Sequence, residues 1–468
     1  MVVDAYFRHG DEYREPTARI SSRNPPGQPV ASPAVPESKS PVQSFSAPIG
    51  TRDVLAPESA RWTALLATFA GVAGQYGYGM VHTPMFEDLG VFLRMGEGTD
   101  VVTKEMYDFE DKGGRRIALR PEGTASVVRA FVEHRPIVPW KAWYVTPAFR
   151  YEKPQKGRYR QHHQVGIEAL GVDDPDIDVE VIALADRYLK ALGAKQYSLV
   201  VNSMGSLDDR RAYDTALSEF LAGVRDDLAE EDREKAERNP LRVLDSKRRE
   251  TIHATAGAPS VTDVLSAEST ERFARVTEGL DALGIAHRVE PRLVRGLDYY
   301  THTLFEFQSE ALDSAQATIV GGGRYNGLAE ALGGPETPGI GFGSGIERVL
   351  LHLDAEGAFP APESSLDVFV VDVTDGRHAR DLAESLRDAG LSADRGFDGR
   401  SMKAQMKGAN RSGARAAVII GGDEAAAGTV TVRDLRGRSS DGQAEQQTIS
   451  RDDLVPTLRT ILETEPRS

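Results

Sequence analysis

Residues 149–164 read FRYEKPQKGRYRQHHQ, and this stretch predicts two antiparallel strands around a basic turn. The preceding segment, 141–152, alternates and is rich in aromatic residues; segment 164–169 alternates again, and Pro-Gln-Lys-Gly between them favours a turn. Strand periodicity places Arg150 and Glu152 on one face of the first strand, and Gln164 and Glu168 on one face of the second. Such a polar face is either solvated or holds a polar ligand.

The composition limits the class of protein. A chain of 468 residues suggests about three domains. No apolar run approaches the roughly 18 residues that a membrane span needs, and no secretory signal opens the chain, so we expect a cytoplasmic protein with no membrane partner. Because the chain has no cysteine, disulfides, thiolate nucleophiles and cysteine–zinc sites are excluded.

The formal net charge of −15 argues against a surface that coats nucleic acid generally. Binding to RNA would therefore need local basic clusters, and the sequence contains two: Arg150, Lys153, Lys156, Arg158 and Arg160 in the hairpin, and Arg395, Arg400, Lys403, Lys407, Arg411 and Arg415 near the C-terminus. Each cluster taken alone is also compatible with an ordinary solvated face.

The N-terminal third divides into an extension and an ordered start. Residues 1–45 are rich in Pro, Ser and polar residues without an apolar period, which predicts a disordered extension; a start codon assigned too far upstream would explain the same pattern. From Pro57, apolar residues recur at helical spacing until Gly77, and a strand is expected over residues 80–83, ending at Pro84.

Two further modules follow the hairpin. The charged, helically patterned region between Gly193 and about Val289 predicts an inserted helical module, at about residues 205–285. After Pro362, short apolar strands alternate with helices, which predicts a small α/β domain over 362–468. In its helix at 400–410, Met402, Met406 and Ala409 mark a packing face, whereas Arg400, Lys403, Lys407 and Arg411 recur on another.

Several motifs, in one order along the chain, resemble the histidyl-tRNA synthetase family of class II aminoacyl-tRNA synthetases. They are the hairpin, LRPEGTA (119–125), NPLRVLDSK (239–247), RGLDYYTHTLFEF (295–307), GGGRYNGL (321–328) and GIGFGSGIERVL (339–350). The resemblance implies an α+β fold: a class II antiparallel sheet flanked by helices, over residues 46–361, with the helical insertion and a C-terminal α/β anticodon-binding domain. It also implies a homodimer, with the interface built by the segment from Pro57 to Pro84.

The implied activity is histidine–tRNA ligation with ATP as a substrate and Mg²⁺ as cofactor. Cations should dominate the chemistry, because charge must be neutralised at phosphorus. By resemblance, Arg150 holds the α-phosphate, Arg348 reaches the distal phosphates or adenine, and Arg295 takes the catalytic place particular to this family. Glu152 and Arg158 complete the implied ATP site.

The resemblance also implies the residues that hold the amino acid and the RNA. An imidazole and an ammonium suit carboxylates, amides and phenols in a closed pocket. The implied set for L-histidine is Glu122, Gly123, Thr124, Gln164, Glu168, Tyr299 and Tyr300. For tRNA(His) it is Gln155, Arg400, Lys403, Lys407 and Arg411, in which the four basic residues would meet the anticodon stem.

Other classes of site find less support. Neither glycine cluster at 339–343 meets the G-x-G-x-x-G spacing of a dinucleotide site, and no P-loop motif occurs. His162 and His163 should lie on opposite strand faces, so no shared metal is expected. The alternative function is a non-catalytic histidine-binding regulatory subunit of ATP phosphoribosyltransferase; the retained Arg295, Arg348 and basic C-terminal domain argue against it.

Overall fold

The computed structural model describes residues 45–94, 104–244, 246–294, 299–313, 317–362, 366–436 and 446–463. The predicted extension 1–45 lies outside the described residues except for Phe45, and so does Arg295. The chain divides into two units, residues 1–46 and 47–468, and the elements below all belong to the second.

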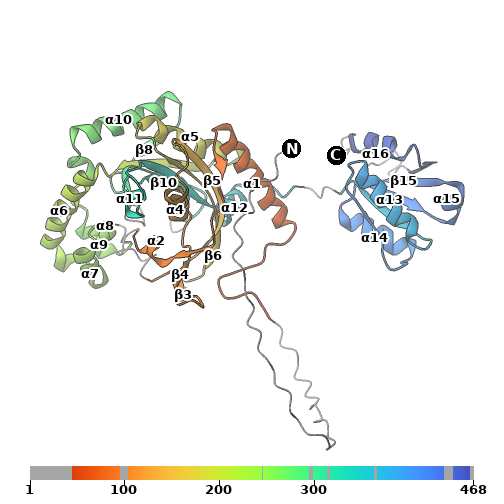
Figure 1. Ribbon diagram of the computed structural model, residues 1–468, viewed down its shortest axis with the longest axis horizontal. Coiled ribbons are helices and arrows are strands. Elements are labelled where there is room, and N and C mark those ends of the chain that lie inside the picture. The colour runs from red at the N-terminus through yellow and green to blue at the C-terminus, as the bar shows by residue number, and fades with distance from the viewer. Residues whose placement is uncertain are drawn as a thin grey trace, which may run out of the picture. The chain divides into compact units, whose positions relative to one another are not determined.

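An eight-stranded sheet organises residues 79–345 (Figure 1). Its neighbours are antiparallel except for the parallel pairs β1–β5 and β7–β8. In spatial order its strands are β1 (Gly79–Met80), β5 (Trp140–Phe149), β6 (Gln161–Leu170), β11 (Gly339–Gly345), β10 (Thr318–Arg324), β9 (Thr301–Ser309), β7 (Tyr197–Ser203) and β8 (His287–Val289).

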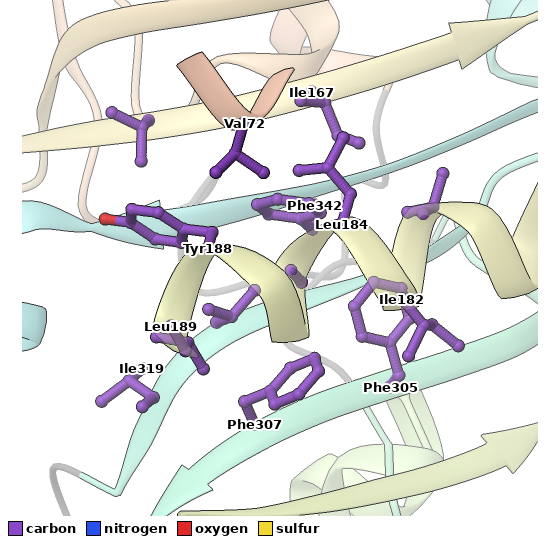
Figure 2. Packing of buried hydrophobic residues seen from close by; sticks show 14 of the residues in the cluster. Val72, Ile167, Ile182, Leu184, Tyr188, Leu189, Phe305, Phe307, Ile319 and Phe342 are labelled. Atoms are coloured by element: carbon purple, nitrogen blue, oxygen red, sulfur yellow. The ribbon is translucent and has the colours of Figure 1, made fainter. Parts of the chain in front are cut away.

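Helices pack against one face of this sheet, among them α1 (Glu58–Gln75), α5 (Pro175–Ala191) and α12 (Ile346–Glu356). Their apolar side chains meet alternate residues of the strands, such as Ile167, Phe305 and Phe342, in one buried cluster (Figure 2). Because side chains alternate across a strand, Glu168 next to Ile167 faces the opposite side of the sheet. There α4 (Thr124–His134) packs with β5, through Val127 and Tyr144.

A small antiparallel sheet, ordered β2-β4-β3, lies in the sequence between β1 and α4. Its strands are β2 (Phe86–Asp88), β3 (Tyr107–Glu110) and β4 (Arg116–Leu119), and the short helix α2 (Leu89–Leu93) follows β2. The apolar residues of α2 and β4 pack with α4 and with α11 (Leu328–Ala331). This cluster positions the beginning of α4, where the LRPEGTA segment ends.

The chain between β7 and β8 is helical (green in Figure 1). It contains α6 (Leu207–Gly223), η1 (Arg225–Asp227), α7 (Glu230–Arg238), α8 (Leu241–Leu244), α9 (Arg249–Ala254), η2 (Val261–Asp263) and α10 (Ala267–Ala282). Buried Asp232 joins the middle of this segment, because it accepts hydrogen bonds from Ser246, Thr251 and Arg248. The NPLRVLDSK motif thus contributes, through Ser246, to a structural polar cluster.

Residues 368–463 form a second, five-stranded mixed sheet ordered β13-β12-β14-β15-β16. The strands are β12 (Val368–Asp372), β13 (Ala393–Arg395), β14 (Ala416–Ile420), β15 (Thr429–Asp434) and β16 (Gln446–Ser450), and the helices are α13 (Arg377–Asp388), α14 (Met402–Ser412), α15 (Gly422–Ala427) and α16 (Leu454–Glu463). Apolar clusters cover both faces of the sheet. The predicted fold class, an antiparallel-dominated sheet flanked by helices and followed by an α/β domain, is confirmed.

Three local predictions were wrong in detail. The first hairpin strand ends at Phe149: the Arg150 N–H still donates to the Arg160 carbonyl, but the Arg160 N–H donates to the Gly50 carbonyl and does not complete the pair. The strand expected over residues 80–83 stops at Met80, since the carbonyls of Thr83 and Pro84 accept from a side chain, that of Arg120. Met402 is 44% exposed, and Gln405 takes the buried place on α14 because its amide bonds the Asp372 backbone.

Candidate active site

A cavity of about 280 Å³ opens at the turn end of the β5–β6 hairpin. It is lined by Arg150, Glu152, Gly157, Arg158, Tyr159, His162, Gln164, Tyr300, Thr318, Ile319, Gly321, Gly343, Gly345, Glu347 and Arg348. The structure therefore brings three of the predicted arginines into one site, together with predicted Glu152, Gln164 and Tyr300. Such a concentration of guanidinium groups suits a polyanionic ligand.

Arg150 is held from one side by the segment that precedes α4. Its Nε donates to the Pro121 carbonyl at 2.9 Å, and its backbone N–H donates to the Arg160 carbonyl at 2.8 Å. Glu152 lies 4.0 Å from the Arg150 guanidinium and 2.7 Å from the Nε of Arg158. The Glu152 carboxylate thus lies between the guanidinium groups of Arg150 and Arg158, which share the cavity.

Arg348 enters the same cavity from the first turn of α12. Its Nη1 donates to the Thr318 carbonyl at 3.0 Å. Its neighbour Glu347 accepts from the His163 backbone N–H at 3.0 Å and lies 3.0 Å from the His163 Nδ1. This pair joins the hairpin to α12, so strands and helix fix the relative positions of Arg150 and Arg348.

The two adjacent histidines have different surroundings. His162 lines the cavity, whereas His163 pairs with Glu347 and packs edge-on against Trp62, with ring centroids 4.8 Å apart. Burial, reinforced by Arg150 and Arg348, lowers the pKa of His162 to about 3, so this ring is neutral at neutral pH. Among the described residues, no group of three or more His, Asp or Glu side chains could hold a metal ion.

A second group of polar side chains surrounds Glu168, which lies four residues beyond Gln164 on β6. Buried Glu168 accepts from the Thr124 hydroxyl at 2.7 Å, from the Tyr144 hydroxyl at 3.3 Å and from the Tyr325 hydroxyl. Burial raises the pKa of Glu168 to about 8, outweighing the three hydroxyl hydrogen bonds, which act in the opposite direction. The arrangement offers a carboxyl group and phenols to a polar, nitrogen-bearing ligand, and a cationic ligand would favour the carboxylate form of Glu168.

Glu122 organises the start of α4 beside this group. Its carboxylate accepts from the backbone N–H groups of Thr124 at 2.6 Å and Ala125 at 2.8 Å, which would otherwise be unpaired at the helix N-terminus. Burial raises the pKa of Glu122, against these hydrogen bonds. At Gly123 a Cβ would lie 2.4 Å from the Tyr144 ring, so glycine is needed for Tyr144 to approach.

Two glycines make room for the carboxylate group within the sheet. Gly341 on β11 pairs with Glu168, and a Cβ there would lie 1.9 Å from the Glu168 Oε2. Gly166 pairs with Tyr144, and a Cβ there would lie 2.4 Å from its hydroxyl oxygen. The glycine-rich motif therefore serves close approach of side chains over the sheet.

The aromatic residues divide into predicted and missed ones. The rings of Tyr299 and Tyr300 lie 4.6 Å apart, and Tyr299 also contacts the Tyr325 ring at 5.9 Å. Tyr144 and Tyr325, which complete the group around Glu168, were not predicted. Tyr325 lies in the GGGRYNGL motif, so its presence there was the available signal; for Tyr144 the signal was only its position in the alternating strand.

The C-terminal domain presents a separate basic surface. Arg400, Lys403, Lys407 and Arg411 are all exposed, as predicted. A further cavity of about 260 Å³, at the carboxyl ends of β12 and β13, contains Arg395 and Phe397. The Arg395 guanidinium lies 4.4 Å from the centre of the Phe397 ring, which is 55% exposed. An exposed ring beside cations is typical of surfaces that stack unpaired bases.

No helix among the described residues is long and apolar enough to cross a membrane.

Comparisons with known proteins agree with this architecture. A family model described as histidyl-tRNA synthetase matches residues 50–349, and one described as anticodon binding domain matches residues 367–461. A histidine–tRNA ligase of Corynebacterium urealyticum is 47% identical over 426 residues, covering 90% of this chain and 98% of its own length. The enzyme of Geobacillus kaustophilus is 49% identical over 391 residues, covering 81% and 91%.

A solved structure of a histidyl-tRNA synthetase also has the fold of this chain. The apo histidyl-tRNA synthetase of Staphylococcus aureus superposes with a TM-score of 0.75 at 38% identity, covering 89% of this chain and all of the other. The family model spans more than half of the 468 residues, and the relatives are matched over nearly their whole length. The chain therefore belongs to the histidyl-tRNA synthetase family.

Proposed function

We propose that this protein is a histidine–tRNA ligase, which joins L-histidine to ATP to form histidyl-adenylate and pyrophosphate and then transfers the histidyl group to the 3′ end of tRNA(His). The observation that carries the proposal is the near full-length similarity to histidine–tRNA ligases, in a chain that retains both the arginine-lined cavity and the Glu168 group.

In the first step, a carboxylate oxygen of histidine attacks the α-phosphorus of ATP, and pyrophosphate leaves. Negative charge has to be neutralised at that phosphorus while the two reactants are held in line. Arg150 is assigned to the α-phosphate and Arg348 to the distal phosphates or adenine, a division supported by their entry into one cavity from different elements. Arg158 and Glu152 would complete this site.

Histidine would be held beside this cavity, with its carboxylate toward Arg150. Gln164 and Tyr300 line the cavity, and Glu168 lies four residues beyond Gln164 on the same strand face. The carboxylate of Glu168, surrounded by hydroxyl groups, is assigned to the imidazole or the ammonium. Glu122, Gly123, Thr124 and Tyr299 remain assigned to the same pocket, to which we add Tyr144 and Tyr325.

In the second step, a terminal ribose hydroxyl of the tRNA attacks the histidyl carbonyl and AMP leaves. Gln155, exposed in the hairpin turn, is assigned to the acceptor end. The C-terminal domain, matched by the anticodon-binding family model, would hold the anticodon stem-loop through Arg400, Lys403, Lys407 and Arg411. The exposed Phe397 beside Arg395 adds a stacking surface to that assignment.

Mg²⁺ is proposed to enter with ATP. It keeps several waters and is commonly held by one or two carboxylates together with phosphates. Glu152 and Glu347 supply two carboxylates at the cavity, which fits this mode and not a dedicated all-protein site. When bound, Mg²⁺ would neutralise phosphate charge beside the arginines.

A homodimeric, cytoplasmic enzyme is proposed. Exposed apolar side chains lie along the β1–β2 segment, where Met80, Met85 and Phe86 are each more than half exposed. This unpartnered surface supports an interface between two copies at the segment from Pro57 to Pro84. Light scattering on the purified protein should give twice the 50.9 kDa chain mass.

The regulatory-subunit alternative is not favoured. A Bacillus halodurans chain named as such a subunit or histidyl-tRNA synthetase is 21% identical with a TM-score of 0.54, which shows a shared fold alone. This chain carries the domain matched by the anticodon-binding family model.

The test is exchange of labelled pyrophosphate into ATP, measured with each of the twenty amino acids. We expect Mg²⁺-dependent exchange with histidine only; exchange with another amino acid but not with histidine would contradict the specificity. Arg295→Ala should slow histidine-dependent exchange by roughly 10²-fold to 10³-fold if this residue stabilises the transition state. Near-normal exchange in that variant would remove Arg295 from the mechanism.

A further inference from the structure

Arg120, in the LRPEGTA segment, is a buried cation whose hydrogen-bond acceptors are all uncharged within the described structure. It is 1% exposed. Its Nε donates to the Pro147 carbonyl at 2.9 Å, and its Nη1 donates to the carbonyls of Thr83 at 3.1 Å and Pro84 at 3.0 Å and to the Thr83 hydroxyl at 2.9 Å. These acceptors come from two segments that are distant in the sequence.

Stability alone explains this residue poorly. Burial of a guanidinium is costly unless a carboxylate or a full set of acceptors compensates for lost hydration. The Nη2 of Arg120 is buried without a hydrogen-bond partner among the described atoms. By contrast Arg324, which is also fully buried, is paired with the Asp178 carboxylate. The side chain of Arg120 therefore points to a role in positioning.

The backbone of the same residue leads directly to Arg150. The Arg120 carbonyl accepts from the Phe149 N–H at 2.9 Å, and the next carbonyl, that of Pro121, accepts from the Arg150 Nε at 2.9 Å. On its other side, the Arg120 N–H donates to the Met85 carbonyl at 3.1 Å. Both the backbone before Arg150 and its guanidinium are thus fastened to residues 120–121.

The side chain of Arg120 completes this support. The hydrogen bond from its Nε to the Pro147 carbonyl ties residues 120–121 to the end of β5, two residues before Phe149. Its bonds to Thr83 and Pro84 tie the same residues to the β1–β2 connection, which lies on no regular ladder there. Three chain segments therefore meet at one planar, five-donor group, and a shorter or uncharged side chain cannot bridge them all.

We propose that Arg120 is a positioning residue for adenylate formation: its guanidinium joins the Thr83–Pro84 connection to the end of β5 and so holds Arg150 in place at the α-phosphate. The inference rests on the proposed function, because it requires Arg150 to act on ATP. A displacement of about 1 Å at a catalytic group costs on the order of 10²-fold in rate, so a loosened support is measurable.

The experiment is a double-mutant cycle in pyrophosphate exchange with the full-length protein. Arg120→Lys should lower kcat about 10-fold to 100-fold and leave the KM for histidine unchanged. In the Arg150→Ala background, Arg120→Lys should cause no further loss beyond about twofold, because it acts through Arg150. Arg129→Lys is the matched control, since that partly buried arginine pairs with Glu87 at 2.6 Å and bonds neither residues 120–121 nor 147–150.

A second variant covers the case in which Arg120→Lys does not fold. Thr83→Val is close in shape and removes only the hydroxyl acceptor. It should also lower kcat, less severely, and its effect should likewise disappear in the Arg150→Ala background. Additive losses, or wild-type kcat in folded Arg120→Lys or Thr83→Val, would overturn the proposal. Histidine-dependent exchange by the wild-type protein in the same experiment shows separately whether the proposed function holds.

Discussion

The close contact between Gly341 on β11 and Glu168 can be used to test whether Glu168 is held rigidly by its hydroxyl partners. In Gly341→Ala, the new Cβ would lie 1.9 Å from the Glu168 Oε2 and 2.3 Å from the Ile167 carbonyl oxygen. The second atom belongs to the backbone of the paired strand, so it cannot rotate away. β11 therefore has to shift away from β6, and Glu168 is displaced from its hydroxyl partners as well unless that shift is large enough to clear its carboxylate.

The magnitude follows from these contacts. Overpacking of this kind costs about 1–3 kcal/mol, and displacement of Glu168 also breaks hydrogen bonds from Thr124, Tyr144 and Tyr325. We therefore expect Gly341→Ala to lose about 2–4 kcal/mol of unfolding free energy. The KM for histidine should rise at least about 10-fold, since about 1.4 kcal/mol of lost binding gives that factor.

Gly343→Ala is the matched control for the unfolding free energy, on the same strand and the same face; because Gly343 lines the cavity, its KM does not serve as a control. The atoms nearest to its Cβ would be those of the Gln164 side chain, at 3.9 Å, which is ordinary contact. Because alanine restricts the unfolded chain more than glycine, this variant should be neutral or more stable by about 0.4–1 kcal/mol. Urea unfolding of both variants measures the difference, and histidine titration in the exchange assay measures KM. Wild-type stability and KM in Gly341→Ala would refute the view that Glu168 is rigidly held.

Three further outcomes are expected. The pKa of Glu168 is about 8 in the folded state, above its usual 4.5, so between these pH values the folded state binds more protons than the unfolded state and the unfolding free energy falls as pH rises. Glu168→Gln should flatten that part of the profile of unfolding free energy against pH, and an unchanged profile would contradict the raised pKa. His302 has a φ of 45°, so His302→Gly should raise the unfolding free energy by about 0.5–1 kcal/mol in urea titrations, whereas a loss would mean that the imidazole packing outweighs the strain. Lys403→Gln with Lys407→Gln should weaken tRNA binding and reduce its logarithmic salt slope by about one to two while leaving pyrophosphate exchange unchanged; wild-type affinity and slope would make this a merely solvated helix face.

The sequence by itself determined the family and the fold class, because local patterns and glycine-rich motifs carry them. The alternating hairpin around Pro154–Gly157 and the motifs at 119–125 and 339–350 sufficed to predict the antiparallel sheet and three arginines that line the cavity, Arg150, Arg158 and Arg348. The alternation along β6 was also sufficient to place Gln164 and Glu168 on one face, since period 2 is a property of the strand alone.

Only the tertiary structure decided how these residues are held. Tyr144 meets Glu168 because strands β5 and β6 pair in one register and Gly166 leaves room, a fact that no local pattern contains. The strand expected at residues 80–83 ends early, at Met80, for the same reason: the carbonyls of Thr83 and Pro84 accept hydrogen bonds from Arg120, 37 and 36 positions away. Hydrogen bonds between segments distant in the sequence depend on how the strands are arranged in the folded sheet, and local residue propensities do not predict them.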